Sequence, residues 1–224
     1  MTCTPVRPNN TTHAATHPSA GKYLAAPLLG TGILMAGYLL ARPYGDAAGG
    51  DTPAAAEAFA STWWVISHLC GMLAIATFAR LAARVHDLLS TVGTRVARTL
   101  GLAGMALVLP YYGLETFGLQ AAGRAALAGD LSALELVTEM RDHPVAMTLF
   151  GVGLGLLAVT GILLAIGWQR HRGDWAAWPL AVMMTLLLPQ FFLPPTGRMA
   201  YGVLYAVAVG VWLIGAVRGG RDGS

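Results

Sequence analysis

The sequence contains little charge. Only 11% of its 224 residues are Asp, Glu, Lys or Arg, whereas a soluble domain carries about 25%. The apolar fraction is 55%, and the mean hydropathy is +0.58. This balance excludes a soluble globular domain as the main body of the chain and favours a bilayer as its solvent.

Lysine and cysteine are also scarce. Lysine occurs once, at Lys22, and the two cysteines are Cys3, in a polar stretch, and Cys70, in an apolar run. Two cysteines in such different settings indicate neither a disulfide framework nor a thiolate metal site. The sequence also lacks the P-loop, HExxH, CxxC and GxSxG motifs, so it gives no sign of the NTPase, zinc protease, dithiol or serine hydrolase sites that they mark.

The remaining positive charge is arginine, and the isoelectric point is near 9.1. A basic chain is a candidate for nucleic-acid binding when its basic residues form a patch with exposed aromatic side chains. Here the arginines flank apolar runs instead. This distribution argues against a nucleic-acid partner.

Six apolar runs approach the 20 or so residues that a membrane-spanning helix needs. They lie at about 24–41, 62–80, 97–119, 145–168, 175–193 and 199–217. We predict an all-α integral membrane bundle of about six transmembrane helices over residues 22–218, between a disordered tail at 1–21 and a short tail at 219–224. Pro194 and Pro195 end the fifth run and predict a tight turn into the sixth.

The arginine distribution predicts the orientation of the bundle. With the N-terminus inside, 10 of the 14 basic residues fall on the cytoplasmic side and 8 of the 11 acidic residues fall on or near the outer side. Positively charged residues are enriched in cytoplasmic loops. We therefore predict a multi-pass protein of the cell membrane with both termini in the cytoplasm.

The longest outer segment is 120–143. In it, Leu127, Leu131, Leu134 and Val137 recur every third or fourth residue among acidic residues. This spacing predicts a short amphipathic helix on the outer surface. The helix is either a lid over the bundle or a solvated connector.

Glycine is abundant, and three glycines lie close together in the fourth span, at Gly151, Gly153 and Gly155. Small residues on a helix surface let neighbouring helices approach closely. We interpret the series as a packing surface. It does not follow a strand, so it is no dinucleotide-binding loop.

Glu115 and His68 are ionisable residues that lie inside the predicted spans. Such residues are costly in a membrane and usually face the interior of the bundle. Glu115 lies about 25 Å across a hydrocarbon core of about 30 Å, and His68 lies about 9 Å below the outer surface. We predict that both are catalytic. Pro110 and Gly113 flank Glu115 and are expected to loosen its helix.

Further candidates occupy the same outer third and are predicted to bind a substrate. Glu57 and Trp64 share one helical stripe with His68, provided that the helix begins before the membrane. The others are Tyr111, Tyr112, Gln190, Arg198, Tyr201 and Tyr205. Their shared depth, on several different spans, predicts a single outward-facing pocket.

Each candidate also has a structural interpretation. Glu115 would pair with Arg198 or Arg124 and hold the bundle together. Tyr201 and Tyr205 would pack between helices. His68 would make one hydrogen bond between helices. Convergence at one depth, rather than any single residue, favours the functional interpretation.

The stretch PYYGLETFGLQAAG, residues 110–123, resembles small multi-pass membrane proteins of actinobacteria. In size and character the chain is similar to small bacterial integral membrane terpene cyclases. The resemblance implies cyclisation of an isoprenoid, in which a proton starts a carbocation cascade, and no catalytic residue is carried over from it. A buried carboxyl group favours its neutral form, which donates protons, and aromatic faces stabilise cations. Glu115, the acidic residue that lies clearly within a span, would be the proton donor.

Three other hypotheses stay open. A transporter or ligand-binding protein would use Glu115 and His68 as a proton site, and an accessory subunit would use the polar residues as a clasp. A b-type haem protein would need two histidine ligands, for which His68 and His143 are the candidates. On the leading hypothesis we expect a lipophilic small-molecule substrate and membrane lipids as partners, with no cofactor, metal or nucleic acid. Protein partners are left open.

Overall fold

The computed structural model describes residues 20–218. These residues are mostly helical, with no strand among them, so the all-α prediction is confirmed. The tails predicted at 1–21 and 219–224 lie outside the described residues, apart from Ala20 and Gly21, which begin the first helix.

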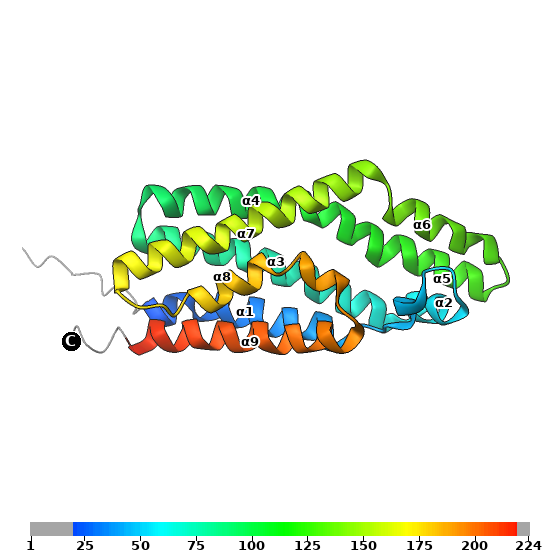
Figure 1. The fold of residues 1–224 in the computed structure, drawn as a ribbon, viewed down its shortest axis with the longest axis horizontal. Helices are drawn as coiled ribbons and strands as arrows, with labels where there is room; N and C mark the ends of the chain where they lie inside the picture. The colour runs from blue at the N-terminus through cyan, green and yellow to red at the C-terminus, as the bar shows by residue number, and fades with distance from the viewer. Residues whose placement is uncertain (1–19, 219–224) are drawn as a thin grey trace, which may run out of the picture.

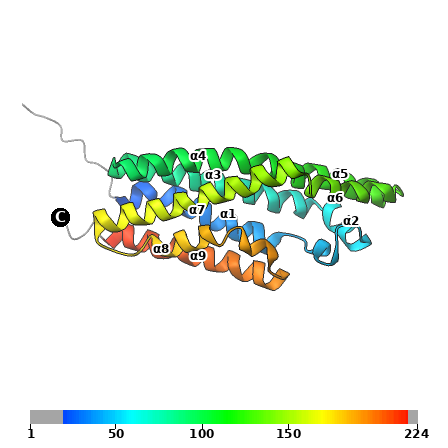
Figure 2. The ribbon, with the colours of Figure 1, turned by 45° about the horizontal axis from the view of Figure 1, so that its top comes forward.

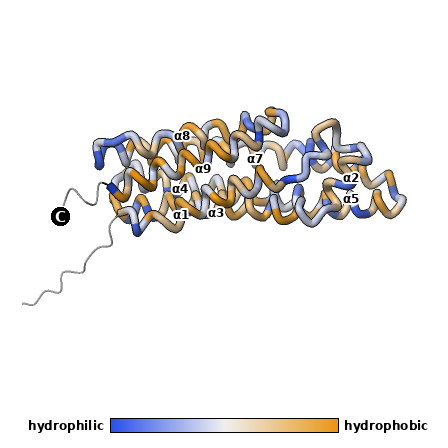
Figure 3. The backbone as a smooth tube through the Cα atoms, turned by 90° about the horizontal axis from the view of Figure 1, so that it is seen from below, coloured by the Kyte–Doolittle hydropathy of each residue, from blue (hydrophilic) through white to orange (hydrophobic). Residues whose placement is uncertain are grey.

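Five long helices form the bundle (Figure 1). They are α1 (Ala20–Ala41), α3 (Thr62–Leu89), α4 (Val92–Gly113), α7 (Pro144–Arg172) and α9 (Pro195–Arg218). α4 continues through a π-helical turn, η2 (Leu114–Gly118), into α5 (Leu119–Leu127). Each long helix, counting α4 with its continuation, is long and apolar enough to cross a membrane. The chain is therefore a multi-pass membrane protein, and hydrophobic residues cover much of these helices (Figure 3).

The predicted fifth span, 175–193, is not one continuous helix. It forms α8 (Trp178–Thr185), a turn and the 3-10 helix η4 (Pro189–Phe192). Inside a helix, the ring of Pro189 would clash with the carbonyl group of Thr185, and α8 ends at Thr185. The prediction of a continuous helix is wrong here. α8 nevertheless packs along α7 and α9 (Figure 2).

Local signals set several helix ends. Thr91 begins α4 with a capping box, because its side chain accepts a hydrogen bond from the backbone of Thr94 and the Thr94 side chain accepts one from the backbone of Thr91. Ser61 caps α3 through a single hydrogen bond, which its side chain accepts from the backbone N–H of Trp63. Gly173, at φ 76°, ends α7 in the left-handed conformation that glycine adopts without strain.

The helices pack closely where small residues meet. A Cβ atom added to Gly153 on α7 would lie 2.9 Å from the carbonyl oxygen of Gly104 on α4, so the close approach predicted for the glycine series is confirmed at this position. Gly151 and Gly155 differ, because an added Cβ atom at either would meet no other atom within 4 Å. Only the middle glycine of the series therefore serves packing.

The two ends of the described chain lie at the same end of the bundle (Figure 1). A Cβ atom added to Gly21 in α1 would lie 2.7 Å from Cγ2 of Val217 in α9. This arrangement requires the segment of α8 and η4 to return the chain from the end of α7 to the start of α9. Which side of the membrane holds these ends stays a prediction.

A helical cap extends beyond the opposite end of the bundle (Figures 1 and 2). It consists of α5, η1 (Gly45–Ala48), α2 (Pro53–Ala60), η3 (Leu131–Leu134) and α6 (Glu135–Arg141). Its own apolar core includes Phe59, Trp64, Leu119, Leu134 and Val137. The segment 120–143 thus forms most of α5, the 3-10 helix η3 and α6 rather than the single surface helix that was predicted. Leu127 and Leu131 stay exposed at its tip, and Leu134 and Val137 are buried.

Candidate functional site

A cavity of about 690 Å³ lies where the bundle meets the cap. Volumes of about 300–1,000 Å³ are typical of sites for small molecules. One wall is charged and holds Arg42, Asp46, His68, Glu115, Arg141 and Arg198. The other wall is apolar and includes Met147, Phe150, Leu188, Phe191, Phe192 and Leu193. The cavity therefore offers a polar surface and an apolar surface to one ligand.

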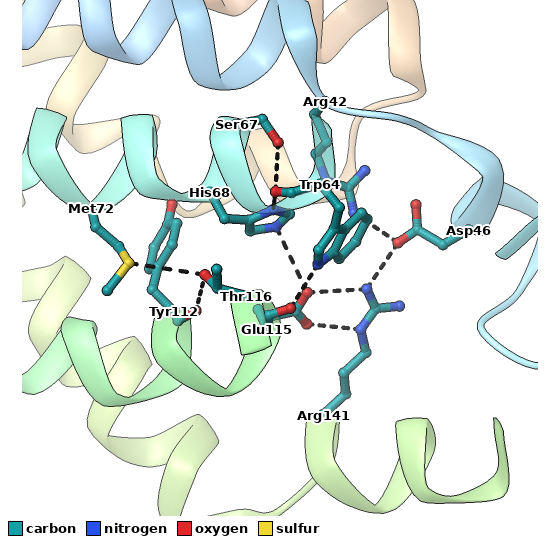
Figure 4. A network of polar contacts seen from close by, with 10 residues as sticks. All are labelled: Arg42, Asp46, Trp64, Ser67, His68, Met72, Tyr112, Glu115, Thr116 and Arg141. Atoms are coloured by element: carbon teal, nitrogen blue, oxygen red, sulfur yellow. Dashed lines mark hydrogen bonds and ion pairs between the residues drawn. The ribbon is translucent and has the colours of Figure 1, made fainter. Parts of the chain in front are cut away.

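A chain of ion pairs crosses the charged wall (Figure 4). Arg141 on α6 places Nε 2.8 Å from Oε1 of Glu115 and Nη2 3.1 Å from Oε2 of the same carboxylate. Nη2 also donates to Oδ2 of Asp46 at 2.9 Å, and that oxygen accepts a second hydrogen bond from Nη2 of Arg42 at 2.7 Å. The network joins the cap to Arg42, which directly follows α1, and to the π-helical turn, so Arg141 holds the cap against the cavity.

Charge pairing governs the protonation of Asp46 and Arg141, which lie outside the membrane-spanning helices. Burial disfavours the charged form of Asp46, but the guanidinium groups of Arg42 and Arg141 outweigh it and hold the pKa of Asp46 below its usual value of 3.8. Burial likewise opposes the charge of Arg141, and Glu115 and Asp46 outweigh it and raise the pKa of Arg141. Both groups are charged at neutral pH.

Glu115 is positioned by the π-helical turn η2. Pro110 lies just before this turn and has no backbone N–H to donate within the helix. The loosening predicted around Pro110 and Gly113 is confirmed, because the five-residue turn replaces regular α-helix. The indole Nε1 of Trp64 donates to the carbonyl oxygen of Glu115 at 2.7 Å and fixes the turn against α3. Turns of this kind are frequent at functional sites.

His68 is 2% exposed and sits between aromatic rings. Its ring centroid lies 4.3 Å from that of Trp64 and 5.3 Å from that of Tyr38. Nδ1 lies 2.7 Å from the carbonyl oxygen of Trp64. A carbonyl oxygen only accepts hydrogen bonds, so Nδ1 carries the proton and Nε2 of the neutral ring is free to accept one. Nε2 lies 3.9 Å from Oε2 of Glu115.

Arg198 lines the cavity at the first turn of α9 and differs from the other two arginines. It forms no ion pair with any residue of the described range 20–218. Its Cζ atom lies 5.5 Å from the ring centroid of Tyr44 and 5.3 Å from that of Phe191. The charge of Arg198 is therefore held by aromatic faces and is available to an anion.

Several buried polar atoms around the cavity have no hydrogen-bond partner within the described chain. They are Nε of Arg42, Oδ1 of Asp46, Oη of Tyr112 and Nε of Arg198. Buried polar groups in folded proteins are nearly always hydrogen-bonded, so such a group points to a ligand or an ordered water. All four atoms belong to residues that line the same cavity.

The structure brings together half of the predicted site residues. Glu115, His68, Tyr111, Tyr112 and Arg198 line one cavity, although they belong to three different helices. Trp64 lies behind them rather than in the lining, because its ring supports His68 and its indole N–H holds Glu115. The single pocket expected from shared depth is present for these residues.

The other predicted site residues lie elsewhere. Glu57 is exposed on α2, because the chain is extended at Ser61 and the stripe toward His68 is broken there. Tyr201 and Tyr205 are buried between helices, as expected if they serve packing. The Tyr201 hydroxyl donates to the carbonyl oxygen of Met183, and the Tyr205 hydroxyl lies 2.9 Å from that of Thr31.

Gln190, which lies in η4, is 1% exposed and does not belong to the cavity lining. Its side-chain oxygen and nitrogen are buried without a hydrogen-bond partner in residues 20–218.

Two predicted pairings are also corrected. The carboxylate of Glu115 pairs with Arg141, and not with Arg198 or Arg124; Arg124 is exposed on α5. The partner was missed because Arg141 lies 26 residues further along the chain, in the cap. His143 is exposed and does not line the cavity, so it does not join His68 in a haem site.

Several residues of the charged wall were not predicted from the sequence. Arg42, Asp46 and Arg141 were interpreted only as charges on the outer side, because they follow or precede apolar runs. A usable signal was present, since Arg42 and Asp46 lie four residues apart and form an ion pair at 2.7 Å. Tyr38 and Phe150, within the first and fourth spans, gave no signal that separates them from packing residues.

The side chains of the site that could bind a metal ion are His68 and the carboxylates of Asp46 and Glu115. No group of three or more His, Cys, Asp or Glu side chains in the described range is arranged to hold a metal ion. The carboxylates of Asp46 and Glu115 already pair with arginine. The arrangement suits an anion that contacts Arg198 and a proton transfer at His68.

Comparison of the chain with family models, with curated proteins and with solved structures gives no match.

Proposed function

We propose that this protein is a cell-membrane enzyme that binds a lipophilic substrate with an anionic headgroup in the cavity between the bundle and the cap. His68 accepts a proton from the substrate, and Arg198 binds its anionic group. One observation carries the proposal: a single cavity joins an arginine without a carboxylate partner in residues 20–218, a histidine with a free ring nitrogen and an apolar wall.

The charge balance of the cavity supports an anionic substrate. Three arginines, Arg42, Arg141 and Arg198, face two carboxylates, Asp46 and Glu115. With His68 neutral, this leaves one net positive charge. Arg42 and Arg141 are committed to carboxylates at 2.7–3.1 Å, so Arg198 supplies the charge that a ligand would neutralise. A guanidinium binds carboxylate and phosphate groups through paired hydrogen bonds.

The apolar wall supports a lipophilic body for the same substrate. Phe150 is 6% exposed and lies 4.5 Å, centroid to centroid, from Tyr111 and 5.5 Å from Phe191. These rings form a continuous aromatic surface beside the charged wall. Sites for small molecules are mostly apolar with a few polar groups that fix orientation. A headgroup at Arg198 would direct the apolar part of the molecule onto these rings.

The geometry of His68 supports its role as the proton acceptor. The Trp64 carbonyl oxygen fixes the tautomer, so the free Nε2 faces the side where Glu115 lies. A general base must reach the proton that it abstracts, and His68 lines the cavity. When Nε2 takes a proton, the neighbouring carboxylate of Glu115 stabilises the resulting imidazolium. Glu115 is a positioning and charge-stabilising residue in this scheme.

The ion pair of Glu115 weighs against acid-initiated cyclisation of an isoprenoid. That reaction needs a neutral carboxyl group as donor, whereas two hydrogen bonds from the Arg141 guanidinium stabilise the carboxylate. A transporter is the second candidate, because the segment that follows α8 and includes η4 interrupts a helix and lines the cavity, and interrupted helices commonly form substrate sites in transporters.

The test is to identify the lipids and small molecules that copurify with the protein in mild detergent, by mass spectrometry. We expect the wild type to retain an anionic amphiphile, and Arg198→Gln to retain about tenfold less, which corresponds to one charge-assisted hydrogen bond. The matched control is Arg124→Gln, which removes an exposed arginine of the cap and should retain the wild-type amount.

His68→Gln separates catalysis from binding. An enzyme in which His68 abstracts a proton would retain the amphiphile in this variant and accumulate its unprocessed form. If wild type and His68→Gln carry the same compound in the same form, the catalytic role is overturned and the binding or transport function stands. If wild type, Arg198→Gln and Arg124→Gln all carry the same bulk phospholipids, the whole proposal is overturned.

A further inference from the structure

We propose that the cavity opens sideways into the membrane, through a portal between α7 and the unwound segment 186–194, and that the apolar chain of the substrate enters and lies there. The portal consists of Met147, Gly151, Leu188, Phe192 and Leu193. This inference rests on the proposed function and deepens it, because it makes the substrate an amphiphile taken from the bilayer rather than a soluble anion.

On the α7 side of the portal, residues line the cavity and also reach the outer surface of the protein. Met147 lines the cavity and is 46% exposed. Gly151, one helical turn later, also lines the cavity, and a Cβ atom added there would meet no other atom within 4 Å. Gly153 on the same helix packs against α4 instead. The wall of α7 is therefore open at Gly151, and the absence of a side chain keeps it open.

The opposite side of the portal is irregular backbone. After α8 ends at Thr185, the chain makes a turn, the 3-10 helix η4 and an extended step before α9 begins. Irregular backbone at membrane depth is tolerated where it is buried in protein or lines a cavity. Leu188, Phe192 and Leu193 line the cavity and are 41%, 85% and 44% exposed. These residues are cavity lining and outer surface at once.

The chemistry of the portal matches a hydrocarbon chain. All five of its residues are apolar or glycine, so the opening offers nothing to a polar group and suits contact with acyl chains. The positive charge of Arg198 lies next to the portal. Cζ of Arg198 is 5.3 Å from the ring centroid of Phe191, which adjoins the portal residue Phe192 in sequence. An amphiphile with its headgroup at Arg198 would therefore extend its chain over Phe191 and out through the portal.

A soluble ligand has a different route. Ala47, on η1 of the cap, lines the cavity and is exposed, and it is not a residue of the portal. A small anion from water would reach Arg198 from the cap side. Blocking the portal should therefore affect membrane-borne and soluble ligands differently.

The experiment uses Gly151→Leu, with Gly155→Leu as its matched control. The two glycines lie one turn apart on α7, both have open space at the Cβ position, and only Gly151 lines the cavity. Leucine favours a helix more than glycine, so both variants should fold. Purified full-length protein is placed in nanodiscs that contain dioleoylphosphatidylglycerol or dioleoylphosphatidylcholine, and the lipid retained after transfer to detergent is counted by native mass spectrometry. Binding of hexyl phosphate is measured separately by calorimetry.

We expect wild type and Gly155→Leu to retain phosphatidylglycerol over phosphatidylcholine, and Gly151→Leu to retain about tenfold less phosphatidylglycerol. Gly151→Leu should still bind hexyl phosphate within about twofold of wild type. Equal retention of phosphatidylglycerol in all three proteins would overturn the portal and leave the proposed function intact. If wild type binds neither the anionic lipid nor hexyl phosphate, the proposed function fails and the portal fails with it.

Discussion

Two clusters of polar side chains, one inside the bundle and one where the bundle meets the cap, differ in how completely their polar groups are hydrogen-bonded. The interior cluster consists of Thr31, Tyr201 and Tyr205, which lie between α1, α8 and α9. Its members are neutral, and each hydroxyl group has a partner: Thr31 donates to the carbonyl oxygen of Ala74 at 3.0 Å, and Tyr205 contacts Thr31 and Met184. This cluster is complete within the protein.

The second cluster is the charged wall of the cavity: Arg42, Asp46, His68, Glu115, Arg141 and Arg198. It contains ion pairs, an arginine without a carboxylate partner among residues 20–218, and polar atoms left without hydrogen bonds there. A satisfied buried network rigidifies a fold, and one with free polar groups is costly unless something else binds them. The comparison indicates that the interior cluster holds helices together and that the charged wall is kept for a ligand.

The largest expected effect follows from removing the centre of the charged wall. Arg141→Leu deprives Glu115 and Asp46 of a partner at 2.8–3.1 Å, in a site where their side chains are only 12% and 7% exposed. Breaking a buried ion pair costs about 3–5 kcal/mol, and the partial exposure of Arg141 places the expected loss at about 3 kcal/mol. Denaturant titration of the protein in detergent measures this free energy of unfolding.

The control for Arg141→Leu is Arg124→Leu. Arg124 is exposed on α5, and its replacement should change the free energy of unfolding by no more than about 0.5 kcal/mol. Equal effects of the two variants would mean that the network of Arg141 contributes nothing specific, and the distinction between the clusters would lose its energetic basis.

The charged wall should also make the stability of the protein depend on pH. The interior cluster, whose members are neutral, should not. The pKa of Asp46 is lower in the folded protein than its usual value of 3.8, because Arg42 and Arg141 outweigh the effect of burial. The unfolded chain therefore binds a proton first as the pH falls. The stabilisation is fully present above pH 3.8 and is lost as the pH falls through the folded value.

Melting temperatures of wild type and Asp46→Asn between pH 7 and pH 3 check this expectation. Asp46→Asn should be the less stable protein near neutral pH, and the difference should shrink as the pH falls below 3.8. A difference that grows on acidification would show that the sign of the linkage is wrong.

A smaller effect is expected in the interior cluster. Tyr205→Phe removes the hydroxyl group that contacts Thr31 at 2.9 Å and Met184 Sδ at 3.2 Å. Hydrogen bonds between membrane helices contribute about 0.6 kcal/mol on average and up to about 1.7 kcal/mol. The free energy of unfolding should fall by an amount in this range, with no change in the copurified amphiphile. Loss of that amphiphile would show that the interior cluster belongs to the site.

The smallest effect on stability is expected from replacing Gln190, and this replacement should be neutral or stabilising rather than destabilising. Its side-chain oxygen and nitrogen are buried without partners in the described chain. Replacing such a group by an apolar side chain of similar shape is neutral or stabilising. Gln190→Met should therefore equal or slightly exceed wild type in thermal melting. A clear loss of stability would indicate that Gln190 binds a water or ligand, and the site would then include Gln190.

Hydropathy alone located the long helices. The runs at 24–41, 62–80, 97–119, 145–168 and 199–217 all fall within long helices of the structure, because apolar length is a property of contiguous sequence. The run at 175–193 has the same composition but breaks at Pro189. Composition averages over a window, whereas a single proline removes one backbone donor and clashes with one carbonyl group.

The candidate site was predictable in part for the same reason. Depth along a helix follows from residue number, so Glu115, His68 and Arg198 were placed at one level of the bundle by counting residues. Depth does not tell which way a side chain points around the helix axis. Tyr201 and Tyr205 share that region of sequence with Arg198, yet they face the interior cluster and not the cavity.

The sequence by itself determined that the chain is an all-α multi-pass membrane protein with polar residues gathered toward one end, because both properties follow from the order of apolar and polar residues. Only the tertiary structure decided that Glu115 pairs with Arg141, that Arg198 has no carboxylate partner in residues 20–218, and that α7 is open at Gly151. These facts depend on helix rotation and on contacts between segments far apart in the chain. The interactions between neighbouring residues in the sequence determine neither the rotation of a helix about its axis nor its contacts with distant segments.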